Sequence, residues 1–281
     1  MLYPKRAFVK KQMKRRFIMI KLIAMDLAGT LLDNNFELQD FNREALAAAH
    51  KKGITIVLAT GKLIYSILPI IESIGLKSPQ ITCFGATVIT GDLKILDSDK
   101  ICPKDYLGAV KTVRENGYNP MVTLEDNKIY YDKEDGAIGL MKKSGEKILK
   151  VDSIEDGDFS KKVVSISIIT GKDGLLYKCL VKKFSSKMQI MKPAEQFISI
   201  LSLGVSKGKA LSNIMKLLNM EKEEVAAFGD SLNDMSMFDR AGLKIAVKNA
   251  HPDLLAKADA VAEENYNNGA GKAIYKYILA I

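Results

Sequence analysis

Residues 22–33 read LIAMDLAGTLLD, an apolar run that ends in a single acid, Asp26, and continues into a glycine and a threonine. The apolar part lacks the alternation of a half-exposed strand, and such runs are typical of parallel sheets covered by helices on both faces. Further runs of this kind occur at residues 54–60, 80–84, 224–230, 243–247 and 258–263. Amphipathic helical patterns accompany these runs, so the sequence predicts an α/β fold with a doubly wound, Rossmann-like parallel sheet.

The middle of the chain has a different pattern. Residues 86–192 contain short β-rich pieces that alternate apolar and polar side chains, with Gly-Asp and Asp-Gly turns between them. This change predicts an α+β domain inserted into the α/β domain. We therefore expect a basic, disordered N-terminal extension over residues 1–18, a core domain formed by residues 19–85 and 193–281, and a cap domain formed by residues 86–192.

Composition and charge limit the classes of function. The chain has 281 residues, of which 47% are apolar and 27% charged, and this suits a folded protein rather than a disordered one. The net charge is +9, but residues 1–18 hold seven basic and no acidic side chains, so only +2 remains for the other residues. Because the excess charge lies in the extension, we expect no nucleic-acid partner for the folded body.

Hydropathy and cysteine content bear on location. No run of about 18 apolar residues is present, so we expect no membrane-spanning helix and no membrane partner. The three cysteines, Cys83, Cys102 and Cys179, are odd in number and widely separated. This pattern favours a reduced, cytoplasmic protein over one stabilised by disulfides.

Polar side chains follow the predicted parallel strands at the edge where open α/β sheets bind ligands. Asp26 follows the first strand and Asp230 the fourth, with Asp234 four residues later. Three carboxylates at one edge repel each other unless a cation neutralises them, and oxygen ligands without His or Cys favour Mg²⁺. Thr60 after the second strand and Lys207 at a helix start add a hydroxyl and a positive charge, which suit a phosphate.

These segments together resemble the motifs of the haloacid dehalogenase-like superfamily, and within it the Cof-type phosphatases. The matching segments are AMDLAGTLLD (24–33), LATGK (58–62), GVSKGKAL (204–211) and AFGDSLNDMSMF (227–238). The resemblance extends from about Met19 to the C-terminus. The long interval between the second and third motifs implies the large α/β cap of the Cof type.

The resemblance implies a Mg²⁺-dependent hydrolase that removes phosphate from a small phosphorylated metabolite through an aspartyl-phosphate intermediate. Asp26 would be the nucleophile, with Thr60 and Lys207 as the other catalytic residues. The implied phosphate- and substrate-binding residues are Thr60, Gly61, Lys207 and Asn233. The implied metal ligands are Asp26, Asp230, Asp234 and the backbone carbonyl of Ala28. The cap would close over the site and select the substrate.

Ala28 stands where the family carries a second aspartate. It keeps the backbone carbonyl that would bind Mg²⁺, but it lacks the side chain that would protonate the leaving group. Three interpretations stay open: a slow or restricted phosphatase, a phospho-ligand binding protein without useful turnover, and a phosphonate-cleaving enzyme. The last fits least, because phosphonate-cleaving relatives with Asp-x-Ala-Gly-Thr carry a cap before the second motif, and residues 30–60 leave room for a single helix.

Two other positions differ from the family's pattern. Lys62 stands where arginine is usual, which replaces a bidentate donor with a point charge. Phe84 stands where asparagine is usual, which removes a polar group from the edge of the pocket. These changes favour the binding-protein interpretation. The nucleophile, the lysine and the metal-binding acids are all retained, however, so we expect an enzyme.

Overall fold

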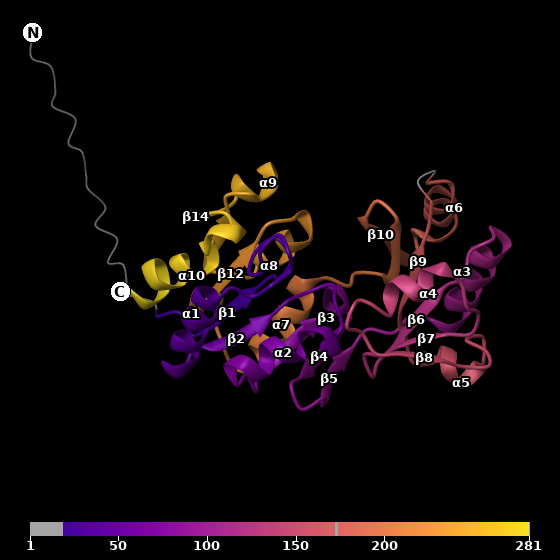
Figure 1. Ribbon diagram of the computed structural model, residues 1–281, viewed down its shortest axis with the longest axis horizontal. Helices are drawn as coiled ribbons and strands as arrows, with labels where there is room; N and C mark the ends of the chain where they lie inside the picture. Colours follow the sequence, from indigo (N-terminus) through magenta and orange to yellow (C-terminus); the bar gives the residue numbers. More distant parts are fainter. Residues whose placement is uncertain (1–18, 172–173, 281) are drawn as a thin grey trace, which may run out of the picture.

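The computed structural model describes residues 19–171 and 174–280, so the extension expected at residues 1–18 lies outside the described residues. The chain forms two lobes (Figure 1), and the lobe with the first and last described residues contains a five-stranded parallel sheet. Its strand order is β14-β13-β12-β1-β2. The strands are β1 (Leu22–Met25), β2 (Thr55–Leu58), β12 (Val225–Gly229), β13 (Leu243–Val247) and β14 (Ala260–Ala262).

Helices pack around this sheet and confirm the predicted doubly wound core. One group is α1 (Asp40–Lys51), α2 (Ile64–Ile74) and α10 (Gly269–Ala273), in which α1 contacts both of the others. A second group is α7 (Lys207–Leu217), which contacts α8 (Met235–Phe238), and the short α9 (Pro252–Leu255) lies beside β13. Within the described residues, no helix is both long enough and apolar enough to span a membrane.

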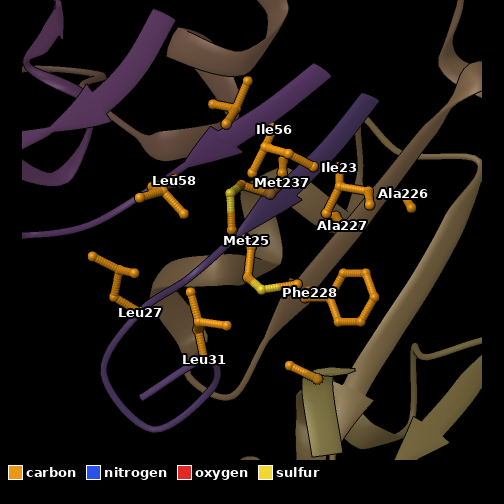
Figure 2. Packing of buried hydrophobic residues seen from close by; sticks show 14 of the residues in the cluster. Ile23, Met25, Leu27, Leu31, Ile56, Leu58, Ala226, Ala227, Phe228 and Met237 are labelled. Atoms are coloured by element: carbon orange, nitrogen blue, oxygen red, sulfur yellow. The ribbon is translucent and has the colours of Figure 1, made fainter. Parts of the chain in front are cut away.

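The uninterrupted apolar strands form the centre of the core. Every residue of β1 and β12 is buried, as expected for strands covered on both faces. Figure 2 shows Met25 of β1 near Phe228 of β12, with Leu27 and Leu31 of the following loop alongside. Burying one such side chain contributes about 1.5–3 kcal/mol. The loops at the carboxyl ends of these strands are therefore attached to a rigid, well-packed layer.

The strand expected at residues 80–84 is only partly joined to the parallel sheet. A parallel bridge between Ala59 and Ile81 links it to β2. The buried side chain of Gln80 lies between the two strands, where its Oε1 accepts the N–H of Leu58 at 2.7 Å. Because a side-chain amide takes the place of a backbone partner here, the regular parallel ladder ends at β2.

This strand instead begins a small antiparallel sheet, in the order β3-β4-β5. Its members are β3 (Pro79–Thr82), β4 (Thr87–Thr90) and β5 (Ile95–Ser98), and the short turn η1 (Cys83–Gly85) follows β3. Val88 and Ile89 of β4 belong to the same apolar cluster as the parallel sheet. The small sheet therefore packs with the core lobe.

The second lobe has its own six-stranded sheet, mostly antiparallel, in the order β10-β11-β9-β6-β7-β8. Its strands are β6 (Met121–Leu124), β7 (Ile129–Tyr131), β8 (Ile148–Lys150), β9 (Val163–Ile169), β10 (Met188–Ala194) and β11 (Phe197–Ser202). Its helices are α3 (Pro103–Glu115), α4 (Gly136–Met141), α5 (Gly157–Ser160) and α6 (Leu175–Phe184). A separate apolar cluster holds this lobe together, as expected for an inserted α+β module.

The placement of the strands bears on the domain boundaries. Residues 86–98 are expected in the cap, but β4 and β5 pair with β3 in the core lobe. Residues 193–202 are expected in the core, but β11 pairs with β9 in the cap sheet. We therefore propose that the cap begins after Ser98 and ends at Ser202, rather than at residues 86 and 192.

Hydrogen bonds from cap side chains join the two lobes at the start of α2. Oδ1 of Asn127 accepts the N–H of Ile64, and Oε1 of Glu146 accepts the N–H of Leu63, both at 2.9 Å. The first N–H groups of a helix have no partner within the helix. The cap therefore supplies hydrogen-bond acceptors for the backbone N–H groups at the N-terminus of α2, a core helix that directly follows the Thr60–Lys62 loop.

Candidate active site

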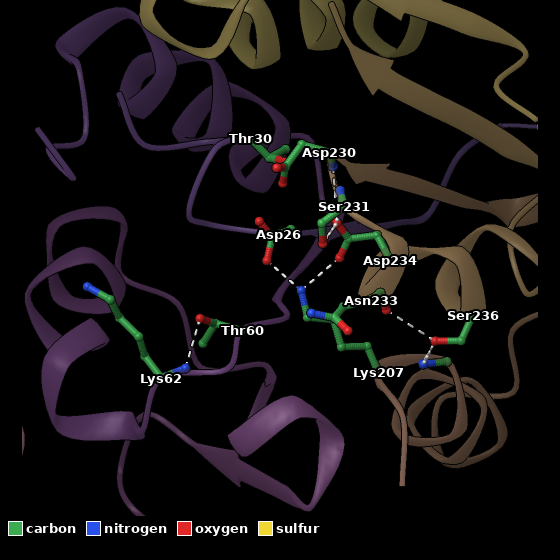
Figure 3. Close-up of polar contacts among 11 residues, drawn as sticks. Asp26, Thr30, Thr60, Lys62, Lys207, Asp230, Ser231, Asn233, Asp234 and Ser236 are labelled. Carbon is green, nitrogen blue, oxygen red and sulfur yellow. Dashed lines mark hydrogen bonds and ion pairs between the residues drawn. The ribbon is translucent and has the colours of Figure 1, made fainter. Parts of the chain in front are cut away.

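Loops at the carboxyl ends of β1 and β12 carry three carboxylates that lie close together (Figure 3). Asp26 follows β1, Asp230 follows β12, and Asp234 ends the short turn η3 (Leu232–Asp234). One oxygen from each carboxylate lies within 4.8 Å of the other two. Because β1 and β12 are parallel neighbours, their carboxyl ends meet at one edge of the sheet.

The side chain of Lys207, the first residue of α7, enters the same cluster. Its Nζ lies 2.5 Å from Oδ1 of Asp26 and 2.7 Å from Oδ1 of Asp234. The three residues are almost fully buried, with 3%, 6% and 0% of their surface exposed. Burial alone would lower the pKa of Lys207, but the two carboxylates raise it above its ordinary value. Lys207 is therefore charged at neutral pH, and its charge is matched by the acids.

Three carboxyl groups share the single positive charge of Lys207. Burial raises the pKa of Asp26 well above its ordinary value, against the effect of Lys207, and the neighbouring Asp234 raises it further. Burial and Asp234 also raise the pKa of Asp230. A cation among these oxygens would remove the repulsion and return the acids to their ionised form. Because the donors are all carboxylate oxygens, the site could hold a hard divalent metal ion.

Neighbouring groups hold two of the acids in position. Oγ1 of Thr30 donates a hydrogen bond to Oδ1 of Asp230 at 3.0 Å. The backbone N–H groups of Asp230 and Ser231 both donate to Oδ2 of Asp234 at 3.0 Å. Neither Thr30 nor Ser231 was expected from the sequence to have a role at the site. The role of Ser231 could have been predicted, because Ser-x-x-Asp is the spacing of a capping box. The structure contains this capping box, formed by Ser231 and Asp234.

The loop between Asp26 and Thr30 passes very close to Asp230. Gly29 has a φ of +83°, and a Cβ at this residue would lie 2.6 Å from Oδ2 of Asp230. Both the backbone conformation and the contact therefore require glycine. Ala28 precedes it as an exposed residue, so the loop offers a methyl group where a carboxyl would stand in the family's pattern.

The second loop places Thr60 inward and Lys62 outward. Thr60 is buried, and its Oγ1 accepts the N–H of Lys62 at 3.1 Å. The side chain of Lys62 points away from the three acids (Figure 3), and its Nζ lies 5.4 Å from the ring centroid of Phe36. The structure therefore does not bring Lys62 to the acidic cluster.

A pocket of about 440 Å³ opens beside Lys207, between the two lobes. Asn233 and Ser236 line it from the core, and Gln189 and Met191 of β10 line it from the cap. Asn233 is among the residues predicted from the sequence, whereas Gln189 and Met191 are not. The alternation along a cap strand does not reveal which of its side chains face a pocket completed by the other lobe.

The fold and the acidic cluster define the class of protein: an α/β protein with an inserted cap and a site suited to a divalent metal. The chain belongs to the haloacid dehalogenase-like hydrolase family, whose sequence profile matches residues 23–274. The match confirms the resemblance drawn from the four motifs.

Similar proteins include several named phosphatases. The 5-amino-6-(5-phospho-D-ribitylamino)uracil phosphatase YcsE of Bacillus subtilis (strain 168) is 27% identical over 95% of this chain and 99% of that protein. The pyridoxal phosphate phosphatase YbhA of Escherichia coli (strain K12) is 25% identical over 92% of this chain and 99% of that protein. These relatives support the prediction that the chain is an enzyme of the phosphatase type.

Solved structures of similar shape confirm the fold class. TM0651 from Thermotoga maritima matches with a TM-score of 0.82 and 23% identity, over 92% of this chain and 97% of that chain. A haloacid dehalogenase-like hydrolase from Bacteroides thetaiotaomicron matches with a TM-score of 0.83 and 23% identity, over 92% of this chain and 99% of that chain. Because 92% of this chain is matched in each case, the similarity covers both lobes.

Proposed function

We propose that the chain is a Mg²⁺-dependent phosphatase that removes phosphate from a small phosphorylated metabolite through an aspartyl-phosphate on Asp26. The observation that carries this proposal is the buried Asp26–Lys207–Asp234 cluster, with Asp230 close enough to share a cation. The relatives named as phosphatases of phosphorylated metabolites support the substrate class.

The metal would be held by Asp26, Asp230 and Asp234, together with the backbone carbonyl of Ala28. When bound, Mg²⁺ would offset the negative charge of the acids and of the phosphoryl group, so that they can approach each other. Oxygen donors without histidine or cysteine support Mg²⁺ over zinc. The proposal therefore makes both binding and turnover of phosphate esters depend on Mg²⁺.

In the chemical steps, the cluster supplies the nucleophile and a positive charge. One oxygen of Asp26 forms a bond to phosphorus while the bond from phosphorus to the leaving oxygen breaks. Water then attacks the aspartyl-phosphate, which releases inorganic phosphate and restores Asp26. Lys207, Thr60 and the backbone at Gly61 would hold the phosphoryl oxygens and offset their charge. Asn233, which lines the adjacent pocket, would contact the substrate.

Ala28 restricts the substrates that such an enzyme can use. A positioned proton donor contributes about 10²- to 10⁴-fold to a rate, or roughly 3–5 kcal/mol of barrier. An alkoxide leaving group needs that proton, whereas acyl and aryl oxygens leave as stable anions without it. We therefore propose a phosphatase that favours acyl or aryl phosphates and is slow on alkyl phosphates.

A second candidate function is a phospho-ligand binding protein without useful turnover. Ala28 favours it, and so does Lys62, whose side chain points away from the acids. Such a protein would keep Mg²⁺ and phosphate binding but would not cleave esters of any class. For either function we propose a cytoplasmic protein without nucleic-acid or membrane partners, in line with its three free cysteines, Cys83, Cys102 and Cys179.

A panel of aryl, acyl and sugar phosphates, assayed with and without Mg²⁺, tests the proposal. We expect Mg²⁺-dependent release of phosphate from the aryl and acyl compounds and little from the sugar phosphates. Asp26→Asn should abolish turnover, because it removes the nucleophile. Mg²⁺-dependent phosphate binding without any turnover would favour the binding protein, and an absence of both would contradict the two functions together.

A further inference from the structure

The turn after β3 places an aromatic ring over the second loop of the site. Cys83, Phe84 and Gly85 have φ values of +50°, +58° and +102°. Such a conformation is uncommon for a bulky side chain and persists only where the surrounding structure holds it. The ring of Phe84 lies against Gly61, since a Cβ at Gly61 would come within 3.0 Å of the ring carbon Cδ1.

Phe84 also contributes to an apolar wall of the pocket beside Lys207. Met191, Leu232 and Met235 line the same pocket of about 440 Å³, while polar side chains such as Asn233 and Ser236 line the rest of it. Nε2 of Gln189 lies 3.2 Å from the sulfur of Met191, which holds that side chain in place. Hydroxyl groups that face this wall would lose water without gaining a partner from it, because the polar groups of the pocket lie elsewhere in its lining. A planar ring would instead pack on Phe84 and on the methionine sulfur.

We propose that Phe84 is a specificity-determining residue that selects phosphate esters whose leaving group is a planar aromatic or heteroaromatic ring. The proposal rests on the proposed function, because it assumes that the phosphoryl group binds at Asp26 and Lys207. The ring of the leaving group lies on Phe84 and the wall beside it. The pocket wall and Ala28 are separate features, and both suit this class of substrate.

An aryl leaving group can depart without an acid at position 28. An Asp26 oxygen forms the bond to phosphorus, and the bond from phosphorus to the aryl oxygen breaks with its electron pair on that oxygen. The resulting aryl oxide is a stable anion and takes a proton from water after it departs.

Binding of two phosphonates that cannot be hydrolysed tests the proposal directly. Phenylphosphonate and cyclohexylphosphonate carry the same phosphonate group and rings of similar size, but only the first ring is planar. Their dissociation constants are measured by calorimetry with saturating Mg²⁺ for the wild type, Phe84→Leu and Phe184→Leu. Phe184 is a matched control, since it belongs to the apolar cluster of the cap lobe. Binding of inorganic phosphate with Mg²⁺ serves as the check that each protein is folded.

We expect the wild type to prefer phenylphosphonate by about 2- to 12-fold, the range that aromatic pairs contribute. Phe184→Leu should keep this preference, and Phe84→Leu should lose it while still binding inorganic phosphate. Equal affinities in the wild type, or a preference that survives Phe84→Leu, would overturn the role of Phe84 and leave the proposed function standing. If inorganic phosphate itself fails to bind with Mg²⁺, the proposed function and this inference fall together.

Discussion

At the scale of single residues, the chemistry of the site depends on what stands beside Asp26. Ala28 is exposed, and its loop is anchored by the contact of Gly29 with Asp230. A larger side chain at residue 28 therefore has room without disturbing the acids. A carboxyl group can therefore be introduced at residue 28 without other changes, and its contribution to the rate can be measured.

We predict that Ala28→Asp raises kcat for alkyl phosphates by about 10²- to 10⁴-fold, because it supplies a proton donor to the leaving oxygen. The effect on aryl phosphates should be much smaller, since their leaving groups need no proton. Steady-state kinetics on one alkyl and one aryl ester measure both effects. Ala28→Asn is the control of equal size without an acid. Equal rates for the two variants would contradict the mechanism.

Lys207 is the positive partner of two buried acids, so its removal leaves Asp26 and Asp234 without one. We predict that Lys207→Met destabilises the metal-free protein by about 3–5 kcal/mol, as expected for breaking a buried ion pair. Chemical denaturation with a chelator present measures the loss, and excess Mg²⁺ should restore part of it.

The control for this loss is Lys209→Met, two residues along the same helix. Lys209 pairs with Asp99 at 2.6 Å, but both side chains are partly exposed to solvent. Exposed pairs contribute about 0–1 kcal/mol. If both variants lose the same stability, Lys207 is not the buried counter-charge that its geometry indicates.

At the scale of elements, the loops rather than the strands hold the acids in register. Gly29 and Gly75 both have a positive φ, of +83° and +74°, but a Cβ at Gly75 would meet nothing within 4 Å. Gly75 is the C-cap residue that follows α2, far along the chain from the acids. An alanine at residue 75 would therefore cost backbone strain alone, whereas an alanine at residue 29 would also displace Asp230.

We predict that Gly29→Ala and Gly75→Ala both lose stability, by about 1–2 kcal/mol of backbone strain. Gly29→Ala should also weaken Mg²⁺ binding by about 10- to 100-fold, the usual effect of disturbing a group that orients a metal ligand. Calorimetric titration with Mg²⁺ measures this difference. Unchanged Mg²⁺ affinity in Gly29→Ala would show that Asp230 does not bind the metal.

The contact of Glu146 with the start of α2 should make stability depend on pH. Burial raises the pKa of Glu146 above its ordinary 4.5, although the hydrogen bond from Leu63 lowers it. The folded protein therefore binds this proton more tightly than the unfolded chain. The stabilisation that comes from protonated Glu146 is fully present below pH 4.5 and is lost as the pH rises through the raised pKa.

We predict that Glu146→Gln keeps an oxygen acceptor for Leu63 and removes this loss. The melting temperature of the variant should equal that of the wild type in acid and exceed it progressively as the pH approaches 7. Glu224→Gln is a control that should show the opposite pH dependence. The hydrogen bond from Lys21 lowers the pKa of Glu224, so this variant should become less stable than the wild type as the pH rises. A difference that is constant with pH would rule out ionisation of Glu146 as the cause.

At the scale of the whole molecule, the excess charge and the site lie in different parts of the chain. Deleting residues 1–18 removes seven of the positive charges that make the net charge +9. We predict unchanged steady-state kinetics and elution from heparin at lower salt, because the deleted charges attract anions without contributing to the site. The full-length chain assayed in parallel is the control. A loss of turnover on deletion would assign the extension a part in catalysis.

The pocket is likewise a property of the whole molecule. Gln189 and Met191 reach it from a strand of the cap, while Asn233 and Lys207 reach it from the core. No local pattern joins these four residues. β10 begins within the β-rich region predicted at residues 86–192, but its position over the core follows from how the two lobes pack.

The sequence alone determined the parallel strands of the core and the residues that follow them. Uninterrupted apolar runs must be buried on both faces, so the acids after them necessarily collect at one edge of the sheet. The tertiary structure decided what depends on contacts between distant segments. It turned Lys62 outward, inserted the side chain of Gln80 beside β2, kept β4 and β5 with the core, and set Phe84 over Gly61. The periodicity of a strand or helix depends on neighbouring residues and can be read from the sequence. The direction of a side chain between two packed lobes depends on contacts with residues far away in the sequence, so it cannot.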